Sequence, residues 1–235
     1  MSGIIHSFQS LGAVDGPGLR CVVFLQGCTL RCAYCHNPDT WSTSGREFRV
    51  EEVFEKVTRF RPYFGKEGGV TVSGGEPLLQ WEFVAELFRR LKAAGVHTAL
   101  DTAGIGSLEG ARAVLKFTDL VLCDLKFSTK EDYLRYSGAD RNRVTNFLEL
   151  TEEMGVPLWV RHVVVPGLTD GRDHILRIAA DARKYSNFQK LELLPFHKIC
   201  AAKYDQMKIP FPLRDFDECP QEKIEALYGL MNVPR

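Results

Sequence analysis

The sequence lacks an excess of charge of either sign and lacks long apolar runs. Its 30 lysine and arginine residues balance 30 aspartate and glutamate residues. Proteins that bind nucleic acid non-specifically usually carry a basic excess that neutralises phosphates, so we expect no nucleic-acid partner. No apolar run approaches the roughly 18 residues that a transmembrane helix needs, so we expect no membrane association. Residues 1–6 contain neither a basic nor a long apolar segment, which predicts no secretory signal and a cytoplasmic location.

Low-complexity stretches, linkers and internal repeats are also absent. Hydrophobic residues make up 45% and charged residues 26% of the 235 positions, which are ordinary values for a globular protein. This composition excludes a disordered or fibrous protein. The length suits one large α/β domain or two small ones, and we expect a single domain over residues 1–235.

Short apolar runs alternate with amphipathic stretches along the chain. The predicted strands are Leu19–Leu25, Gly69–Val72, Val96–Leu100, Leu120–Leu125, Pro157–Val165 and Leu191–Leu194. Two of the predicted helices are Val50–Phe60 and Leu78–Ala93, and Gly95 follows the second as a typical helix end. Apolar strands separated by helices indicate βαβ units around a parallel sheet. Six units are too few for a closed eight-stranded barrel, so we predict an α/β fold with an open partial (β/α)6 barrel.

Polar or irregular segments follow every predicted strand. They are a cysteine-rich loop, Ser73-Gly74-Gly75-Glu76, Asp101-Thr102, Asp124-Leu125-Lys126, Val165-Pro166-Gly167 and Leu194-Pro195-Phe196-His197. In a parallel α/β array these strand ends share one face, where barrel enzymes place their active sites. The layout therefore predicts an enzyme.

Three of the seven cysteines lie within eight residues. Cys28, Cys32 and Cys35 have the spacing C-x3-C-x2-C, and no second C-x-x-C occurs in the chain. Three thiolates suit a [4Fe-4S] cluster whose fourth iron has no protein ligand. A structural zinc site, completed by His36 or a distant cysteine, is the alternative. Cys21 and Cys123 lie within predicted strands and are expected to be core residues.

Several motifs in a fixed order are similar to those of the glycyl-radical-enzyme activating enzymes, a family of the radical S-adenosylmethionine (radical SAM) superfamily. They are Asp15-Gly16-Pro17-Gly18, the run from Cys28 to Trp41, Ser73-Gly74-Gly75-Glu76-Pro77, Asp101-Thr102, Asp124-Leu125-Lys126, Arg161, Val164–Gly167 and Leu193–His197. The resemblance spans nearly the whole chain and implies a barrel of the radical SAM type.

The resemblance implies that the three cysteines hold a [4Fe-4S] cluster and that the open iron binds the methionyl amino and carboxylate groups of S-adenosylmethionine. An electron from the cluster then cleaves the sulfonium carbon–sulfur bond. The resulting 5′-deoxyadenosyl radical takes a hydrogen from a glycine Cα of a partner protein. The cofactor supplies this chemistry, and the protein positions it and excludes quenchers.

The same resemblance assigns the remaining cofactor contacts. They are Tyr34, Cys35, His36 and His197 toward the adenine, Gly74, Gly75 and Glu76 toward the methionyl amino group, and Asp124, Leu125, Lys126 and Arg161 beside the rest of the cofactor. Each assignment has a plainer alternative. The glycines would form an ordinary turn, Tyr34 and His36 would pack over the cluster, Lys126 would be a solvated strand end, Arg161 would form a buried salt bridge, and His197 would be a structural hydrogen-bonding residue.

Two further groups are implied in the same way. Asp101, Thr102 and Asp124 would bind a monovalent cation or the ribose, with a hydrogen-bonded polar cluster as the alternative. Asp15 and Asn37 would hold the glycine-bearing loop of the partner.

The chain departs from the family pattern at Cys200 and Lys208, where glycine is expected, which puts the local loop shape in question. No cysteine-rich insertion separates the first helix from the second strand. Activases of several other glycyl radical enzymes carry ferredoxin-like clusters there, so the resemblance implies pyruvate formate-lyase as the partner, with another glycyl radical enzyme or a small molecule as the alternative substrate. A non-enzymatic electron carrier and a zinc-stabilised binding protein are the remaining interpretations. We expect a monomer that takes electrons from flavodoxin or ferredoxin.

Overall fold

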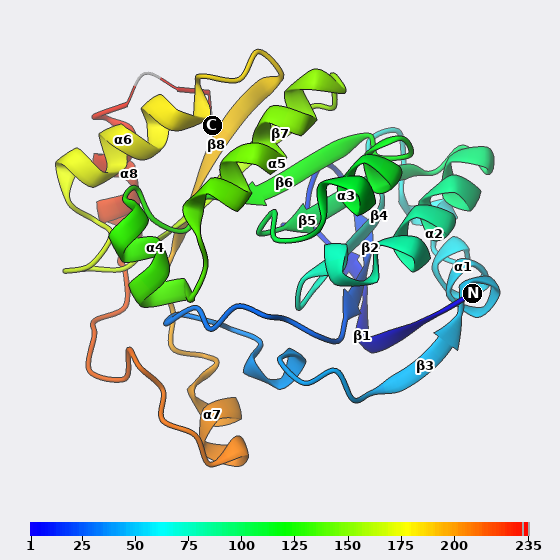
Figure 1. Cartoon of the computed structure of the whole chain (residues 1–235), viewed down its shortest axis with the longest axis horizontal. Coiled ribbons are helices and arrows are strands. Elements are labelled where there is room, and N and C mark those ends of the chain that lie inside the picture. Colours follow the sequence, from blue (N-terminus) through cyan, green and yellow to red (C-terminus); the bar gives the residue numbers. More distant parts are fainter. Residues whose placement is uncertain (232, 235) are drawn as a thin grey trace.

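Eight strands form one sheet in a computed structural model that describes residues 1–231 and 233–234 (Figure 1). The strand order is β3-β1-β2-β4-β5-β6-β7-β8. The strands are β1 (Ser2–Gly12), β2 (Arg20–Leu25), β3 (Arg46–Arg49), β4 (Gly69–Gly74), β5 (His97–Thr102), β6 (Leu120–Asp124), β7 (Leu158–Val164) and β8 (Phe188–Pro195). All six predicted strands are present, and from β2 to β8 each pairs with its neighbour in parallel. Strands β3 and β8 lie at the two ends of the sheet and do not pair with each other, so the barrel is open, as predicted.

The two additional strands, β1 and β3, extend the sheet beyond β2 in the antiparallel sense. Neither strand forms an apolar run in the sequence, for a physical reason. Strand β1 mixes polar and apolar residues and is largely exposed or half-buried, and β3 is a short, charged edge strand. A half-exposed antiparallel strand such as β1 and a short edge strand such as β3 lack the continuous apolar character of the buried parallel strands.

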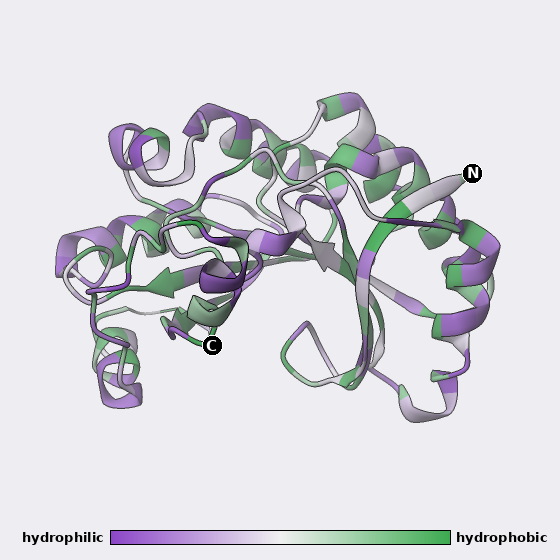
Figure 2. Ribbon diagram, turned by 90° about the horizontal axis from the view of Figure 1, so that it is seen from below, coloured by the Kyte–Doolittle hydropathy of each residue, from purple (hydrophilic) through white to green (hydrophobic). Residues whose placement is uncertain are grey.

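Helices follow the strands and cover the outside of the sheet. They are α1 (Val50–Thr58), α2 (Trp81–Ala93), α3 (Leu108–Leu115), α4 (Lys130–Ser137), α5 (Arg141–Glu153), α6 (Arg172–Ala182), α7 (Ala201–Met207) and α8 (Gln221–Tyr228), with short 3-10 turns η1 (Pro38–Thr40), η2 (Arg61–Tyr63) and η3 (Pro77–Gln80). Hydrophilic and hydrophobic residues alternate along these helices (Figure 2), as expected for amphipathic helices that cover a sheet. No helix among the described residues is long and apolar enough to cross a membrane.

The second predicted helix begins later than expected. Residues Pro77–Gln80 form η3, and the α-helix starts at Trp81 instead of Leu78. The Glu76 carboxylate accepts a hydrogen bond from the Leu78 amide and so caps the tight turn first. The end is as predicted: α2 stops at Ala93, and Gly95 adopts the left-handed conformation with φ 69°.

The core is formed by the two faces of the parallel strands and the helices packed on them. Cys21 and Cys123 are buried in it, 1% and 0% exposed, which confirms their prediction as core residues. One segment lies apart from this body: α7 packs against η1, below the loop that follows β2 in Figure 1. The Tyr204 hydroxyl on α7 donates to the Cys35 carbonyl at 3.1 Å, so this segment contacts the cysteine loop.

Candidate active site

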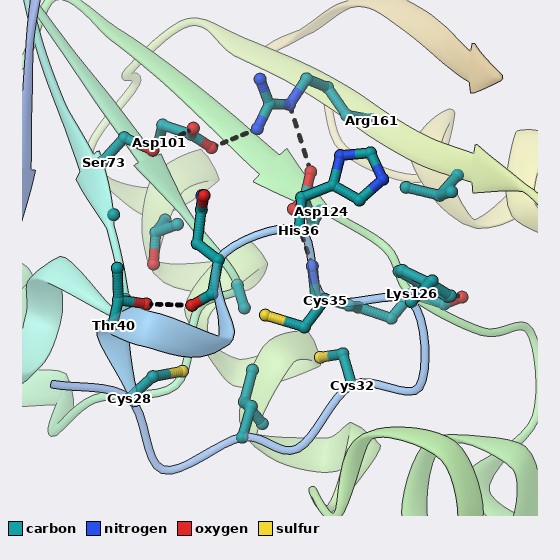
Figure 3. A pocket seen from close by; sticks show the side chains of 18 residues that line it. Cys28, Cys32, Cys35, His36, Thr40, Ser73, Asp101, Asp124, Lys126 and Arg161 are labelled. Carbon is teal, nitrogen blue, oxygen red and sulfur yellow. Dashed lines mark hydrogen bonds and ion pairs between the residues drawn. The ribbon is translucent and has the colours of Figure 1, made fainter. Parts of the chain in front are cut away.

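The carboxyl ends of the parallel strands and the cysteine loop enclose a pocket of about 230 Å³ (Figure 3). Most of the predicted site residues line it, namely Cys28, Cys32, Tyr34, Cys35, His36, Asn37, Gly74, Gly75, Asp101, Thr102, Asp124, Lys126 and Arg161. Four predicted residues do not line it: Asp15, Glu76, Leu125 and His197. Residues from the cysteine loop after β2 and from four strands therefore meet at one place, although up to about 130 positions separate them in the chain.

The three cysteines form one side of the pocket, and Figure 3 shows their sulfur atoms around the same open space. Their loop has no regular secondary structure and is fixed to the end of α4, because the Arg31 amide donates to the Ser137 carbonyl at 2.9 Å. Burial raises the pKa of Cys28 to about 11 and that of Cys32 to about 12. The free thiols are thus protonated near neutral pH, and metal binding must release their protons.

This donor set fits an iron–sulfur cluster. Three thiols line a pocket with free volume beside them, and thiolate sulfur is the ligand type that such clusters use. Among the described residues, no three His, Cys, Asp or Glu side chains are grouped as a site for a single metal ion. A cluster larger than one ion suits three thiols that surround a common space.

Lys126 lines the same pocket as the cysteines and is not a solvated strand end. Its side chain is only 12% exposed, and its ammonium forms an ion pair with the Asp124 carboxylate at 2.7 Å. Burial favours the neutral lysine, but the charge and hydrogen bond of Asp124, together with the nearby Cys32 and Tyr34 side chains, outweigh it and raise the pKa of Lys126. Two tyrosines fix the Lys126 backbone: its amide donates to the Tyr133 hydroxyl at 3.0 Å, and the Tyr34 hydroxyl donates to its carbonyl at 3.1 Å. A fixed, charged ammonium therefore faces the pocket.

Arg161 on β7 joins the two carboxylates at the strand ends. Its guanidinium forms ion pairs with Asp101 and, at 3.1 Å, with Asp124, so the predicted alternative of a buried salt bridge is present in the structure. Burial opposes ionisation of Asp124, but Lys126 and Arg161 outweigh it and lower its pKa to about 2. Burial raises the pKa of Asp101 and Arg161 opposes this, while Ser73 donates to Asp101 at 2.6 Å.

These contacts bear on the cation site expected at Asp101, Thr102 and Asp124. Each of the four carboxylate oxygens already accepts from Arg161, Lys126 or Ser73. The Thr102 hydroxyl donates to Glu76 at 2.5 Å. The alternative, a hydrogen-bonded polar cluster, describes this region of the structure, and a cation there would have to displace one of these donors.

The two glycines at the end of β4, Gly74 and Gly75, are required by the conformation and close approach of the backbone. Gly74 has φ 112°, and a Cβ there would lie 2.3 Å from the Leu25 nitrogen. A Cβ on Gly75 would lie 2.1 Å from the Gly27 carbonyl oxygen. The absence of side chains lets the end of β4 approach the start of the cysteine loop, where the Glu76 amide donates to Gly27 at 2.8 Å. The glycines thus bring the strand end and the loop together at the pocket.

The Glu76 carboxylate points away from this pocket. It is fully buried and accepts from the Thr102 hydroxyl and from the Ala103 amide at 2.9 Å. Burial raises its pKa to about 7, although these donors oppose the rise. Its side chain holds the turn after β5 in place, and it is not available in this conformation to accept from a ligand in the pocket.

The predicted residues at the rim have different surroundings. His36 Nε2 lies 3.0 Å from the His197 carbonyl, while the His197 side chain is exposed. Asn37 lines the pocket, and its side-chain oxygen accepts from Lys203 Nζ at 2.9 Å. Asp15 lies in the loop between β1 and β2, and its Oδ2 atom is buried with no hydrogen-bond partner among the described residues.

Sequence reasoning missed two of these residues. Ser73 was quoted only as part of a motif, although its position directly before the glycines at a strand end indicates that it faces the pocket. Lys203 gave no signal, because a single lysine on a seven-residue helix is ordinary surface composition. Its contact with Asn37 joins positions 166 residues apart and depends on the folded chain.

The comparisons with known proteins agree with this geometry. The model of the radical SAM superfamily matches residues 22–179. The pyruvate formate-lyase-activating enzyme of Clostridium pasteurianum is 46% identical over 227 residues, which are 96% of this chain and 95% of that protein. The chain belongs to the family of pyruvate formate-lyase-activating enzymes within the radical SAM superfamily. A further member, from Staphylococcus aureus strain USA300, is 41% identical over 242 aligned positions that cover 99% of this chain and 96% of that protein.

A solved structure supports the radical SAM fold. It is a domain of pyruvate-formate lyase-activating enzyme from Bacteroides vulgatus, with a TM-score of 0.57 and 22% identity, and the match covers 69% of this chain and 92% of that one. Membership in the radical SAM superfamily implies S-adenosylmethionine and a [4Fe-4S] cluster as cofactors. The zinc-site and electron-carrier interpretations are therefore set aside in favour of a radical SAM enzyme.

Proposed function

We propose that this chain activates pyruvate formate-lyase by installing a glycyl radical in it. One observation carries the proposal: three thiols and a buried, charged Lys126–Asp124–Arg161 group line one pocket. This is the donor set for a cluster on one side and for a zwitterionic ligand on the other. Near full-length similarity to proteins with that activity in their names supports the choice of partner.

The bound cofactors supply one-electron cleavage of the sulfonium carbon–sulfur bond and a radical that removes a hydrogen atom from a glycine Cα. Cys28, Cys32 and Cys35 would hold the cluster. The Lys126 ammonium would donate to the cofactor carboxylate, since a charge-assisted hydrogen bond is stronger than a neutral one. Asp124 keeps this ammonium charged and directed into the pocket.

The structure suggests a revision of two roles. The Glu76 side chain is buried against the turn after β5, so the backbone carbonyls of Gly74 and Gly75 are the better acceptors for the methionyl ammonium at this end of the pocket. The side chain of His197 is exposed, and its carbonyl lies beside His36. We infer that His197 acts by orienting His36, and that Tyr34 and His36 shape the space for the adenine and the rest of the cofactor. Leu125 is buried outside the pocket and would act by supporting the neighbouring Lys126.

Asp15 and Asn37 would hold the glycine-bearing segment of the partner. The buried Asp15 Oδ2 lacks a donor, and an unpaired buried acceptor is costly until a donor reaches it. A backbone N–H of the partner can supply that donor. A monovalent cation beside Asp101, Thr102 and Asp124, electron supply by flavodoxin or ferredoxin, a monomeric state, a cytoplasmic location and a single domain over residues 1–235 remain predictions.

The direct test is radical formation in the partner. We would mix the anaerobically reconstituted, reduced protein with S-adenosylmethionine and pyruvate formate-lyase, and record the electron paramagnetic resonance (EPR) spectrum. We expect a glycyl radical signal, lyase activity and 5′-deoxyadenosine. A variant of the lyase with its radical-bearing glycine replaced by alanine is the control and should give no signal. A radical on a different glycyl radical enzyme, with none on this lyase, would contradict the proposed partner.

A further inference from the structure

Lys203 controls which way the side-chain amide of Asn37 faces. Its ammonium donates to Asn37 Oδ1 at 2.9 Å and forms an ion pair with Asp39 Oδ1 at 3.0 Å. A lysine ammonium can only donate hydrogen bonds. The carbonyl end of the Asn37 amide must therefore face Lys203, and the amino end must face elsewhere. Within residues 1–231 and 233–234, no group accepts a hydrogen bond from that amino end, and Asn37 lines the pocket.

Lys203 itself is held from both sides. Its partner Asp39 also lies 3.0 Å from His6 Nε2 on β1, and the neighbouring residue Tyr204 bonds the Cys35 carbonyl at 3.1 Å. The ion pair is partly exposed, with 35% of the lysine and 30% of the aspartate side chain accessible. Pairs of this kind contribute little to stability. The contact is therefore better explained by the orientation it imposes on Asn37 than by a contribution to folding.

We propose that Lys203 is a positioning residue, which fixes the Asn37 amide so that its NH₂ group is presented at the pocket as a hydrogen-bond donor for a backbone carbonyl of the partner. The proposal rests on the proposed function, because it assumes a glycine-bearing segment at this rim. Glycine has no side chain, so an enzyme that acts on it must recognise its segment largely through backbone N–H and C=O groups.

The test compares four single variants of the full-length, cluster-loaded protein with wild type. Lys203→Met removes the ammonium but keeps the length of the side chain, and Lys203→Arg keeps a donor. Asn37→Asp keeps an acceptor for Lys203 but removes the NH₂ group. Lys198→Met is the matched control, since this lysine lies on the same segment and reaches only the Arg214 carbonyl at 3.3 Å. The readouts are 5′-deoxyadenosine formed without partner, and kcat and KM for glycyl radical formation on pyruvate formate-lyase.

We expect Lys203→Met and Asn37→Asp each to raise KM for the partner about threefold to tenfold, the range for one lost neutral hydrogen bond. Lys203→Met should leave cofactor cleavage without partner unchanged, because Lys203 does not line the pocket. Lys203→Arg should stay within about twofold of wild type, as should Lys198→Met. The double variant Lys203→Met/Asn37→Asp should have the KM of Asn37→Asp alone, because both changes remove the same hydrogen bond from the Asn37 NH₂ group to the partner.

Three results would overturn the proposal: an unchanged KM in Asn37→Asp, a loss in Lys203→Met that falls on kcat or on cofactor cleavage instead of KM, or strictly additive effects in the double variant. Absorbance of the cluster and thermal unfolding of each variant separate a folding defect from a binding defect, and Asn37→Asp carries the test if Lys203→Met does not fold. Failure of the proposed function is distinct, because wild type would then form no radical on the lyase.

Discussion

The two sides of the pocket are built differently. The strand side consists of Ser73, Asp101, Asp124, Lys126 and Arg161, which follow or lie in parallel strands and are tied by ion pairs and hydrogen bonds. The loop side consists of residues 28–37, which have no regular secondary structure. These residues are held by hydrogen bonds to α4 and to the segment around α7. We call these two groups the strand side and the loop side.

This difference indicates which parts of the site exist before any cofactor binds. The charged groups of the strand side form ion pairs with each other inside the fold, so their positions are fixed by the protein alone. The thiols of the loop side are protonated when free, because burial raises the pKa of Cys32 to about 12. Loss of a loop-side ligand should therefore abolish chemistry with little effect on folding, and loss of a strand-side charge should destabilise the fold as well.

The largest effect is expected for Cys32→Ser. Removal of one of three thiol ligands should prevent stable assembly of the cluster and reduce 5′-deoxyadenosine formation to background, because the open iron site is lost. The unfolding midpoint of the metal-free protein should change little. Cys200→Ser is the control, since this thiol is buried near the loop but does not line the pocket. Equal loss of cluster absorbance in both variants would contradict the assignment of the three ligands.

On the strand side, Arg161→Met should destabilise the metal-free protein. The substitution leaves the buried Asp101 and Asp124 carboxylates without their shared cation, and breaking a buried ion pair on one side typically costs about 3–5 kcal/mol. Urea unfolding at pH 7 measures this loss. Arg112→Met, which breaks an exposed pair with Glu153, should cost less than about 1 kcal/mol. Similar losses for the two variants would show that the strand side is not preorganised by its charges.

A pH dependence specific to the strand side follows from Asp124. Lys126 and Arg161 overcome the effect of burial and lower its pKa from 3.8 to about 2. A lowered folded-state pKa adds stability above the unfolded value, and this contribution is lost as the pH falls from about 4 toward 2. Asp124→Asn should therefore be less stable than wild type at pH 7, by on the order of 2 kcal/mol, and the difference should shrink over that acid range. A difference that does not change with pH would contradict this assignment.

The smallest effect is expected at the end of α7, beside the loop side. Lys208 has φ 56°, a left-handed conformation that favours glycine. Lys208→Gly should stabilise the protein by about 0.5–1 kcal/mol, the relief of backbone strain less the larger chain entropy of unfolded glycine. Met207→Gly, one residue earlier inside the helix, should destabilise it by about 1 kcal/mol. Thermal unfolding distinguishes the two, and a loss in Lys208→Gly would refute the strain argument.

Much of the strand side could be predicted from the sequence. Apolar runs locate β2 and β4 to β8 within a few residues, and the rule that parallel strands share their carboxyl edge brings Asp101, Asp124 and Arg161 together. Strand β1 was not predicted because it is a half-exposed antiparallel strand, in which polar and apolar residues are mixed. The expected Gly at position 208 agrees with the left-handed backbone that Lys208 adopts there.

Side-chain directions could not be predicted in the same way. Glu76 belongs to a motif at a strand end, yet its carboxylate turns to the Thr102 hydroxyl and the Ala103 amide, which only the folded turn after β5 brings near. His197 similarly contributes its carbonyl to His36 while its side chain is exposed. The hydrogen bond from Lys203 to Asn37 depends on where α7 packs, and no local pattern in the sequence predicts that position.

The most direct test of the account asks whether the two sides form one cofactor site. We would reduce the cluster-loaded wild type and Lys126→Met anaerobically and record their EPR spectra with and without S-adenosylmethionine. The account predicts a cluster signal in both proteins, a change on adding the cofactor to wild type, and a much weaker change in Lys126→Met at the same cofactor concentration. A cluster signal in wild type that is indifferent to S-adenosylmethionine, or an equal response in both proteins, would contradict it.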